Sequence, residues 1–216
     1  MPGSTAYGGL VHVLRPKEGE TLFVSGAAGA VGGLVGQIAK KVYKCRVIGS
    51  CGGEEKCRLV KERFSFDAAV DYKKASTQEE LTSLLRDASG GQGPASGVDM
   101  YFENVGGIHF EAAMNCLRVG GRVAVCGTIS SYNDKDIQYV PLNLGAMIYT
   151  QQRIEGFLSR PYLTGKIGNF LETMKGWMSA GLLEIEETTF RGLDQWPLGF
   201  QSLFTGGNTG KVVVFV

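Results

Sequence analysis

The chain has 216 residues, of which 44% are hydrophobic and 20% are charged, and its formal net charge is +1. This composition is typical of a folded globular protein and excludes an extensively disordered one. Because the charge is near zero and there is neither a basic run nor a long apolar stretch, we expect no nucleic-acid partner, no membrane partner and a cytoplasmic location.

Short apolar strands alternate with helical patterns along most of the chain. In the first part of the chain, the sequence predicts a helix at 5–14, a strand at 21–25, a helix at 31–41, a strand at 46–50, a helix at 54–63, a strand at 67–72 and a helix at 77–88. After a predicted loop at 89–94, it predicts strands at 98–103, 121–126 and 154–158. The last predicted elements are a helix at 166–180, a strand at 184–190, a helix at 194–204 and a strand at 211–216. Such alternation implies parallel strands joined by right-handed crossovers. We therefore predict an α/β fold with a doubly wound parallel sheet of the Rossmann type.

A glycine-rich turn, Ala27-x-Gly29-x-x-Gly32, joins the first predicted strand to the helix that follows it. At this point of a Rossmann domain, backbone N–H groups and the helix dipole bind pyrophosphate, and glycines let the backbone approach it. Alanine stands where the first glycine is usual. The strand–turn–helix context favours a dinucleotide site over a purely structural turn. The residues expected to bind the dinucleotide here are Gly29, Ala30, Val31 and Gly32.

The end of the second predicted strand bears on the choice between NAD and NADP. An NAD enzyme usually places an acidic residue there to bind the ribose hydroxyls, but residues 50–53 contain none. Lys56 follows at the start of the next helix, where its ammonium group suits a 2′-phosphate. Glu54 and Glu55 leave the NAD alternative open, although their charge also stabilises the start of that helix. The residues alone favour NADP by a narrow margin.

The sequence predicts no metal site. It contains five cysteines and two histidines, His12 and His109, and no two cysteines form a C-x-x-C pair. A zinc site needs three or four clustered ligands, which this inventory hardly supplies. We expect the cysteines to be buried, reduced thiols.

Several segments, taken together and in order, are similar to a known family. They are residues 1–7, 27–32, 36–40, 55–56, 71–73, 103–107, 126–133 and 207–211. On these segments the chain resembles the zinc-independent medium-chain reductases, and closely the branch of prostaglandin reductases and alkenal double-bond reductases. The resemblance implies an NADP(H)-binding Rossmann domain at 1–182. It also implies a segment at 183–216 that in the family returns to a GroES-like catalytic domain.

The resemblance also implies roles for particular residues. Lys56 and Tyr72 would hold the 2′-phosphate of NADP(H), and Asn104 and Asn208 would contact the cofactor. Near the nicotinamide, the resemblance places two further segments: Cys126, Gly127, Thr128, Ile129, Ser130, Ser131 and Tyr132 in the first, and Phe157, Leu158 and Ser159 in the second. Simple packing or turn-capping roles are the alternatives for Tyr72, Asn104 and Tyr132.

The activity that the resemblance implies is reduction of the carbon–carbon double bond of an α,β-unsaturated ketone or aldehyde. Hydride reaches the β-carbon, and negative charge builds up on the carbonyl oxygen. Tyr132 is the candidate catalytic residue, because a phenol can donate a hydrogen bond to that oxygen or help to protonate the product. The expected partner is therefore a small-molecule enone, enal or quinone, and the family's pairing through the nucleotide domain allows a homodimer.

The sequence departs from the family in two places. Ser65 lies in a stretch that is shorter and contains a glycine in relatives, so we expect a different loop there. The GroES-like domain that precedes this region in the family is missing, which predicts a truncated form that binds cofactor but turns over weakly or not at all.

Two other functions stay open, and one is set aside. A cofactor-binding fragment with little activity and an NADPH quinone oxidoreductase are the alternatives. Tyr162-x-x-x-Lys166 has the letters of a short-chain dehydrogenase site. Pro161 and Gly165 argue against a continuous helix there, so we do not expect that class.

Overall fold

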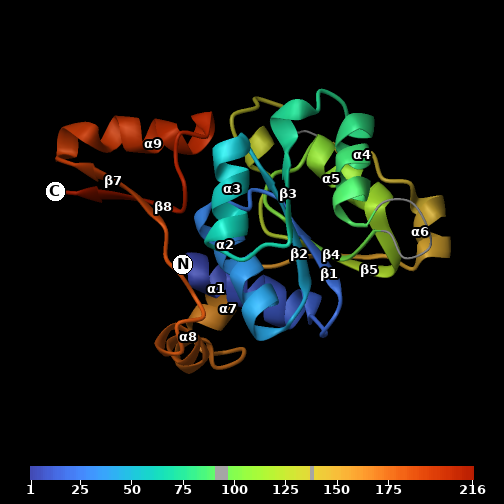
Figure 1. Ribbon diagram of the computed structural model, residues 1–216, viewed down its shortest axis with the longest axis horizontal. Coiled ribbons are helices and arrows are strands. Elements are labelled where there is room, and N and C mark those ends of the chain that lie inside the picture. Colours follow the sequence, from blue (N-terminus) through green and yellow to red (C-terminus); the bar gives the residue numbers. More distant parts are fainter. Residues whose placement is uncertain (91–96, 137–138) are drawn as a thin grey trace.

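The core of the protein is a six-stranded parallel sheet. A computed structural model describes residues 1–90, 97–136 and 139–216, so the predicted loop at 89–94 lies largely outside the described residues. The strand order is β3-β2-β1-β4-β5-β6, which confirms the predicted Rossmann-type sheet (Figure 1). The strands are β1 (Thr21–Val24), β2 (Arg46–Cys51), β3 (Ala68–Asp71), β4 (Val98–Glu103), β5 (Leu117–Val125) and β6 (Arg153–Gly156).

Helices cover both faces of this sheet. One face carries α1 (Pro2–Tyr7), α2 (Ala30–Gln37) and α3 (Glu54–Glu62), and the other carries α4 (Gln78–Ala88) and α5 (Ile108–Cys116). Successive residues of a strand point to opposite faces. Leu22 and Val24 of β1 accordingly join the first core, whereas Phe23 joins the second, where its ring stacks on Tyr101 at 4.9 Å. Both faces of β1 are therefore buried, as a central parallel strand requires.

The two N-terminal helical predictions are confirmed, with a change of helix type. Both α1 and α2 run on as π-helical segments, Gly8–Leu14 and Ile38–Val42. The sequence did not predict α5, nor the short helices α6 (Leu144–Thr150) and α7 (Arg160–Leu163). The apolar residues of α5 spread around the helix rather than forming one stripe, so no clear period marks it.

Three predicted boundaries are wrong. Strand β5 begins at Leu117 rather than residue 121, because Leu117 already pairs with Val98 before the register shifts. Helix α8 (Phe170–Ser179) begins later than residue 166, and Gly168 precedes it in a left-handed conformation, with φ +69°. Strand β7 (Glu187–Arg191) begins after Glu184, whose backbone instead exchanges hydrogen bonds of 2.7 and 3.0 Å with the Gln37 side chain.

The C-terminal residues form a second, smaller sheet. Strand β7 pairs in parallel with β8 (Lys211–Phe215), and helix α9 (Trp196–Thr205) connects them. Figure 1 shows this unit beside the main sheet rather than within it. The domain boundary at 182/183 stays a prediction. Helix α9 exposes a row of aromatic rings, in which Phe200 stacks on Trp196 at 5.5 Å.

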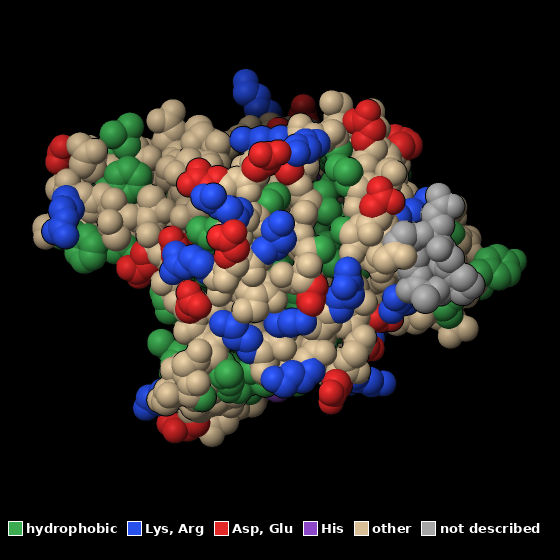
Figure 2. Space-filling view, in the orientation of Figure 1, with side chains coloured by type: hydrophobic (Ala, Val, Ile, Leu, Met, Phe, Trp, Pro, Cys, Tyr) green, Lys and Arg blue, Asp and Glu red, His purple; other side chains and the backbone are tan. Residues whose placement is uncertain are grey.

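The surface shows no region of one charge sign on the face drawn in Figure 2. Lysine and arginine side chains alternate there with aspartate and glutamate side chains (Figure 2). Within the described residues, no helix combines the length and the apolar character needed to cross a membrane.

Candidate functional site

A cavity of about 800 Å³ opens at the carboxyl ends of the central strands. Its walls come from the segments that follow β1, β2, β3, β4 and β5, together with the segment before β8. In a doubly wound sheet the strand order reverses between the first and fourth strands, and ligands bind in the crevice outside the strand ends at that point. The cavity also has the size of a ligand site. The predicted glycine turn lies in its wall.

The glycine turn leaves the start of α2 open to an anion. Gly29 is the N-cap of α2 and donates its N–H to the Gly26 carbonyl at 3.0 Å. Among the described residues, no side chain caps α2, and its first turn contains no acidic residue. Helix α4 differs, because Thr77 and Glu80 form a complete capping box there. The free N–H groups of α2 can therefore bind phosphate oxygens.

The alanine in the turn is accommodated by a glycine on the neighbouring strand. A Cβ atom added at Gly49 would lie 2.6 Å from the Cβ of Ala27, which is too close for two carbon atoms. Gly32 is equally constrained, because a Cβ there would collide with the Gly26 carbonyl oxygen. The departure from the usual first glycine therefore leaves the shape of the turn intact.

Lys56 and Tyr72 both line the cavity. The Lys56 ammonium group donates to the carbonyl oxygens of Gly206 and Asn208, at 2.8 and 2.6 Å. Burial lowers its pKa, but the side chain still lines the cavity. Tyr72 starts the 3-10 turn after β3, and a Cβ added at Gly52 would lie 2.9 Å from its hydroxyl oxygen. A cation and a phenol thus line the same cavity, and the phenol lies beside Gly52.

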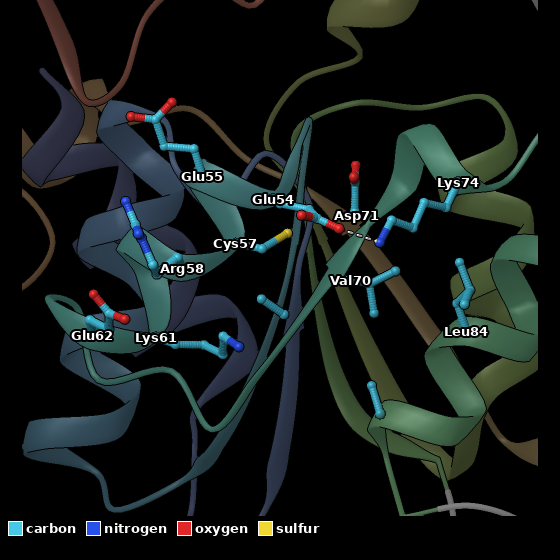
Figure 3. Close-up of a pocket in the computed structure, with 12 residues that line it drawn as sticks. Glu54, Glu55, Cys57, Arg58, Lys61, Glu62, Val70, Asp71, Lys74 and Leu84 are labelled. Atoms are coloured by element: carbon cyan, nitrogen blue, oxygen red, sulfur yellow. Dashed lines mark hydrogen bonds and ion pairs between the residues drawn. The ribbon is translucent and has the colours of Figure 1, made fainter.

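Neither Glu54 nor Glu55 reaches this cavity. Both line a different cavity of about 880 Å³ between α3, β3 and α4 (Figure 3). Glu54 forms an ion pair of 2.7 Å with Lys74 there, which lowers the pKa of the Glu54 carboxyl group. Figure 3 shows the Glu55 carboxylate pointing away from that pair. These two residues therefore do not supply the acidic group that an NAD site would place at the end of the second strand.

A buried carboxylate, which sequence reasoning missed, shapes the middle of the site. Glu103 ends β4 and is fully buried, and one oxygen accepts hydrogen bonds from the Ser25 hydroxyl, the Val105 N–H and the Gly106 N–H, at 2.9, 2.5 and 2.9 Å. The Asn104 side chain donates to the Ser25 carbonyl at 2.7 Å. This network fixes the segment after β4 against the end of β1. An acidic residue at the end of a buried strand was its only signal in the sequence.

The segment after β5 completes the cavity wall and carries Tyr132. The Cys126 N–H donates to the Glu103 carbonyl at 2.9 Å, and burial raises the pKa of the Cys126 thiol to about 11, so the thiol stays protonated. The Tyr132 side chain is 59% exposed, and its hydroxyl oxygen would lie 2.7 Å from a Cβ added at Gly127. The phenol therefore lies over Gly127 at the rim of the cavity.

The predicted residues divide into two sets. Those on the cavity wall are Gly29, Ala30, Val31, Gly32, Lys56, Tyr72, Asn104, Cys126, Gly127, Ile129, Ser130, Tyr132 and Asn208. Within the described part of the chain, those that do not line it are Thr128, Ser131, Phe157, Leu158 and Ser159.

The residues off the wall have other contacts. The Ser131 hydroxyl donates to the Thr128 carbonyl at 3.0 Å. The Phe157 ring packs edge-on against Phe102 at 6.0 Å, and Leu158 is 78% exposed. Their roles near the nicotinamide stay predictions. The wall also contains residues that were not predicted, among them His109, Leu203, Phe204 and Val212.

The alternative motif and the metal question also have structural answers. Tyr162 is buried against His12, and Gly165, with φ +69°, follows the single helical turn of α7. Tyr162 and Lys166 therefore do not share a helix. Over residues 1–90, 97–136 and 139–216, no group of three or more His, Cys, Asp or Glu side chains could hold a metal ion. The cysteines are free, and all are buried except the half-buried Cys126.

The chain is similar to known oxidoreductases along its whole length. A sequence model of the family described as zinc-binding dehydrogenase matches residues 30–175. The NADP(+)-dependent 2-alkenal reductase of Nicotiana tabacum is 42% identical, and the (+)-pulegone reductase of Mentha piperita is 41% identical. Each match covers 100% of this chain but 60% of the relative. The chain thus spans about three fifths of the length of these curated relatives.

A solved structure agrees with these matches. The crystal structure of CurA from Vibrio vulnificus in complex with NADPH superposes with a TM-score of 0.84 and is 38% identical. That match covers 100% of this chain and 62% of the CurA chain.

Proposed function

Because the chain belongs to the zinc-binding dehydrogenase family, we propose that it binds NADP(H) and supplies the cofactor site of a reductase of activated carbon–carbon double bonds. The similarity to a 2-alkenal reductase and a pulegone reductase supports this reaction class, and the NADPH complex of CurA supports the cofactor. Since the chain spans about three fifths of these relatives, the activity of the whole protein is part of the proposal.

The observation that carries the proposal is the arrangement of two anion-binding groups around one cavity. The uncapped start of α2 provides free N–H groups, and Lys56 and Tyr72 line the same cavity. A dinucleotide with a 2′-phosphate needs both, one for its pyrophosphate and one for the phosphate on its adenosine ribose. The residues present therefore fit NADP(H).

When bound, NADPH supplies hydride to the β-carbon of the substrate. The chain's own residues would bind and orient the two reactants. The start of α2 would hold the pyrophosphate, Lys56 would hold the 2′-phosphate, and Cys126 and Gly127 would line the part of the cavity that takes the nicotinamide. Tyr132, at the rim, would donate its phenolic hydrogen bond to the substrate carbonyl oxygen as charge builds up there, which lowers the barrier.

A second candidate function is cofactor binding with little turnover. Tyr132 is 59% exposed, so the described residues of this chain do not exclude water from the proposed reaction centre. Exclusion of water and orientation of the substrate provide much of an enzyme's rate. On this reasoning the chain binds NADPH but orients an enone poorly.

The test uses NADPH that carries deuterium at the transferable position of nicotinamide C4, with 2-nonenal, pulegone and a benzoquinone as substrates. The chain and the longest reading frame that contains it are assayed in parallel, and products are identified by mass spectrometry. We expect the longer protein to yield nonanal with one deuterium at C3, and the present chain to yield much less.

Formation of an unsaturated alcohol would contradict the proposed reaction, because hydride would then have reached the carbonyl carbon. Turnover of the quinone alone would favour the quinone oxidoreductase alternative. Equal rates for the two proteins would rule out the second candidate function. If neither protein binds NADPH, the proposed cofactor site itself is refuted.

A further inference from the structure

His109 is a cavity residue for which the proposed function gives no role. It is the second residue of α5, and its side chain is only 4% exposed. Among the described residues, its Nε2 atom has no hydrogen-bond partner. A buried nitrogen without a partner destabilises the folded state, so its presence in a cofactor cavity calls for an explanation.

The imidazole ring of His109 contacts the ring of Tyr72. The two ring centroids are 4.9 Å apart and the planes meet at 73°, which is an edge-to-face arrangement. This geometry is the favourable one for a pair of aromatic rings. Tyr72 follows a short edge strand, and no hydrogen bond to its hydroxyl group is found in the part of the chain that the structure describes. Packing therefore determines where that hydroxyl group points.

A direct contact between His109 and a bound nucleotide is the less favoured explanation. The Nε2 atom is sealed from the cavity by its neighbours, because it has almost no accessible surface. Burial also lowers the pKa of His109 to about 4, so the ring is uncharged at neutral pH and offers no positive charge to a phosphate. The imidazole therefore contributes only an aromatic surface that packs against Tyr72.

We propose that His109 is a positioning residue for cofactor selectivity: its ring holds Tyr72 so that the phenolic hydroxyl faces the 2′-phosphate beside Lys56. The inference rests on the proposed NADP(H) site and adds to it a residue that does not touch the cofactor. Loss of the His109 ring would let the Tyr72 ring turn and weaken recognition of the 2′-phosphate alone.

The experiment measures dissociation constants by calorimetry for four probes, namely NADPH, NADH, 2′,5′-ADP and 5′-AMP. The variants are His109→Ala, which removes the ring, and His109→Phe, which keeps an aromatic ring but not the nitrogens. Met114→Ala, further along α5, is the control for a general loosening of the helix. Thermal unfolding of each variant shows that the fold is retained.

We expect His109→Ala to reduce the preference for 2′,5′-ADP over 5′-AMP, and for NADPH over NADH, by roughly threefold to tenfold, the range that loss of an aromatic pair predicts. His109→Phe and Met114→Ala should keep the preference. His109→Phe should also unfold at the same or a higher temperature, because the unpartnered nitrogen is gone.

Three results would overturn the positioning role. They are an unchanged preference in His109→Ala, an equal loss of affinity for probes with and without the 2′-phosphate, and a loss in His109→Phe as large as in His109→Ala. A wild-type chain that does not prefer 2′,5′-ADP would refute the proposed NADP(H) site, and the positioning role with it. A wild-type preference that survives His109→Ala refutes the positioning role alone.

Discussion

Replacing Lys56 with methionine should weaken the binding of NADPH much more than that of NADH. Methionine keeps the length and apolar character of the lysine stem, so the change removes mainly the ammonium group. In the structure that group donates two hydrogen bonds, to Gly206 and Asn208, which leaves a third N–H and a full positive charge for the cavity. NADH has no 2′-phosphate and cannot use either.

The size of the effect follows from these contacts. A hydrogen bond to a charged group contributes about 1.5–3 kcal/mol, so the dissociation constant for NADPH should rise roughly 10- to 150-fold. The two bonds to backbone carbonyls position residues 206–208 and affect both cofactors. Together they contribute about 1 kcal/mol to cofactor binding at this partly exposed site, so we expect NADH to weaken by about fivefold.

Calorimetric titration of both cofactors provides the measurement. Lys61→Met is the matched control, because it removes the same charge from the same helix, and Lys61 lines the other cavity. Its binding of both cofactors should change little. If Lys56→Met weakens NADPH and NADH by the same factor, the ammonium group acts only through residues 206–208, and the assignment of the 2′-phosphate to Lys56 is refuted.

Three further predictions concern stability and are checked by urea unfolding. Ser65 has φ +63°, a strained conformation for a residue with a side chain, so Ser65→Gly should raise the free energy of unfolding by about 0.5–1 kcal/mol; a decrease would contradict this. A Cβ at Gly36 would overlap the Phe66 ring, so Gly36→Ala should lower it by about 1–3 kcal/mol, and adding Phe66→Leu should restore part of the loss. Burial lowers the pKa of His109 to about 4, so between pH 6.5 and 4 the unfolded chain binds a proton that the folded chain does not, and stability should fall on acidification by about 3 kcal/mol. His109→Phe should reduce this fall, and an unchanged pH dependence would show that His109 is accessible to protons.

Local signals predicted the main sheet well. The first five strands alternate with helices or turns that have strong sequence markers, such as the capping residue Thr77 and the glycines at 29 and 32. Because a parallel strand in a doubly wound sheet is buried on both faces, short apolar runs were enough to find each one. The resemblance assigned Lys56 and Tyr72 to one site, and both residues line the same cavity.

The errors lie where distant contacts override local pattern. Strand β7 begins late because Gln37, far away in the sequence, engages the backbone of Glu184. His109 lies near the start of α5 and Tyr72 follows β3, and no sequence spacing predicts the contact between their rings. No local pattern distinguishes Glu103 from other acidic residues, and its hydrogen-bond partner Ser25 follows a different strand. Propensity and periodicity carry no information about such pairs.

The hydrogen bond from the Gly210 N–H to the Ala28 carbonyl, at 2.7 Å, has a practical consequence for anyone who trims this protein. Sheet topology suggests that a clone ending near residue 182 would retain the nucleotide-binding half, since β7 and β8 pair only with each other. Such a clone would lose the only described protein donor to Ala28 and both carbonyl partners of Lys56. A fragment that preserves these contacts of the phosphate turn therefore has to extend through Gly210.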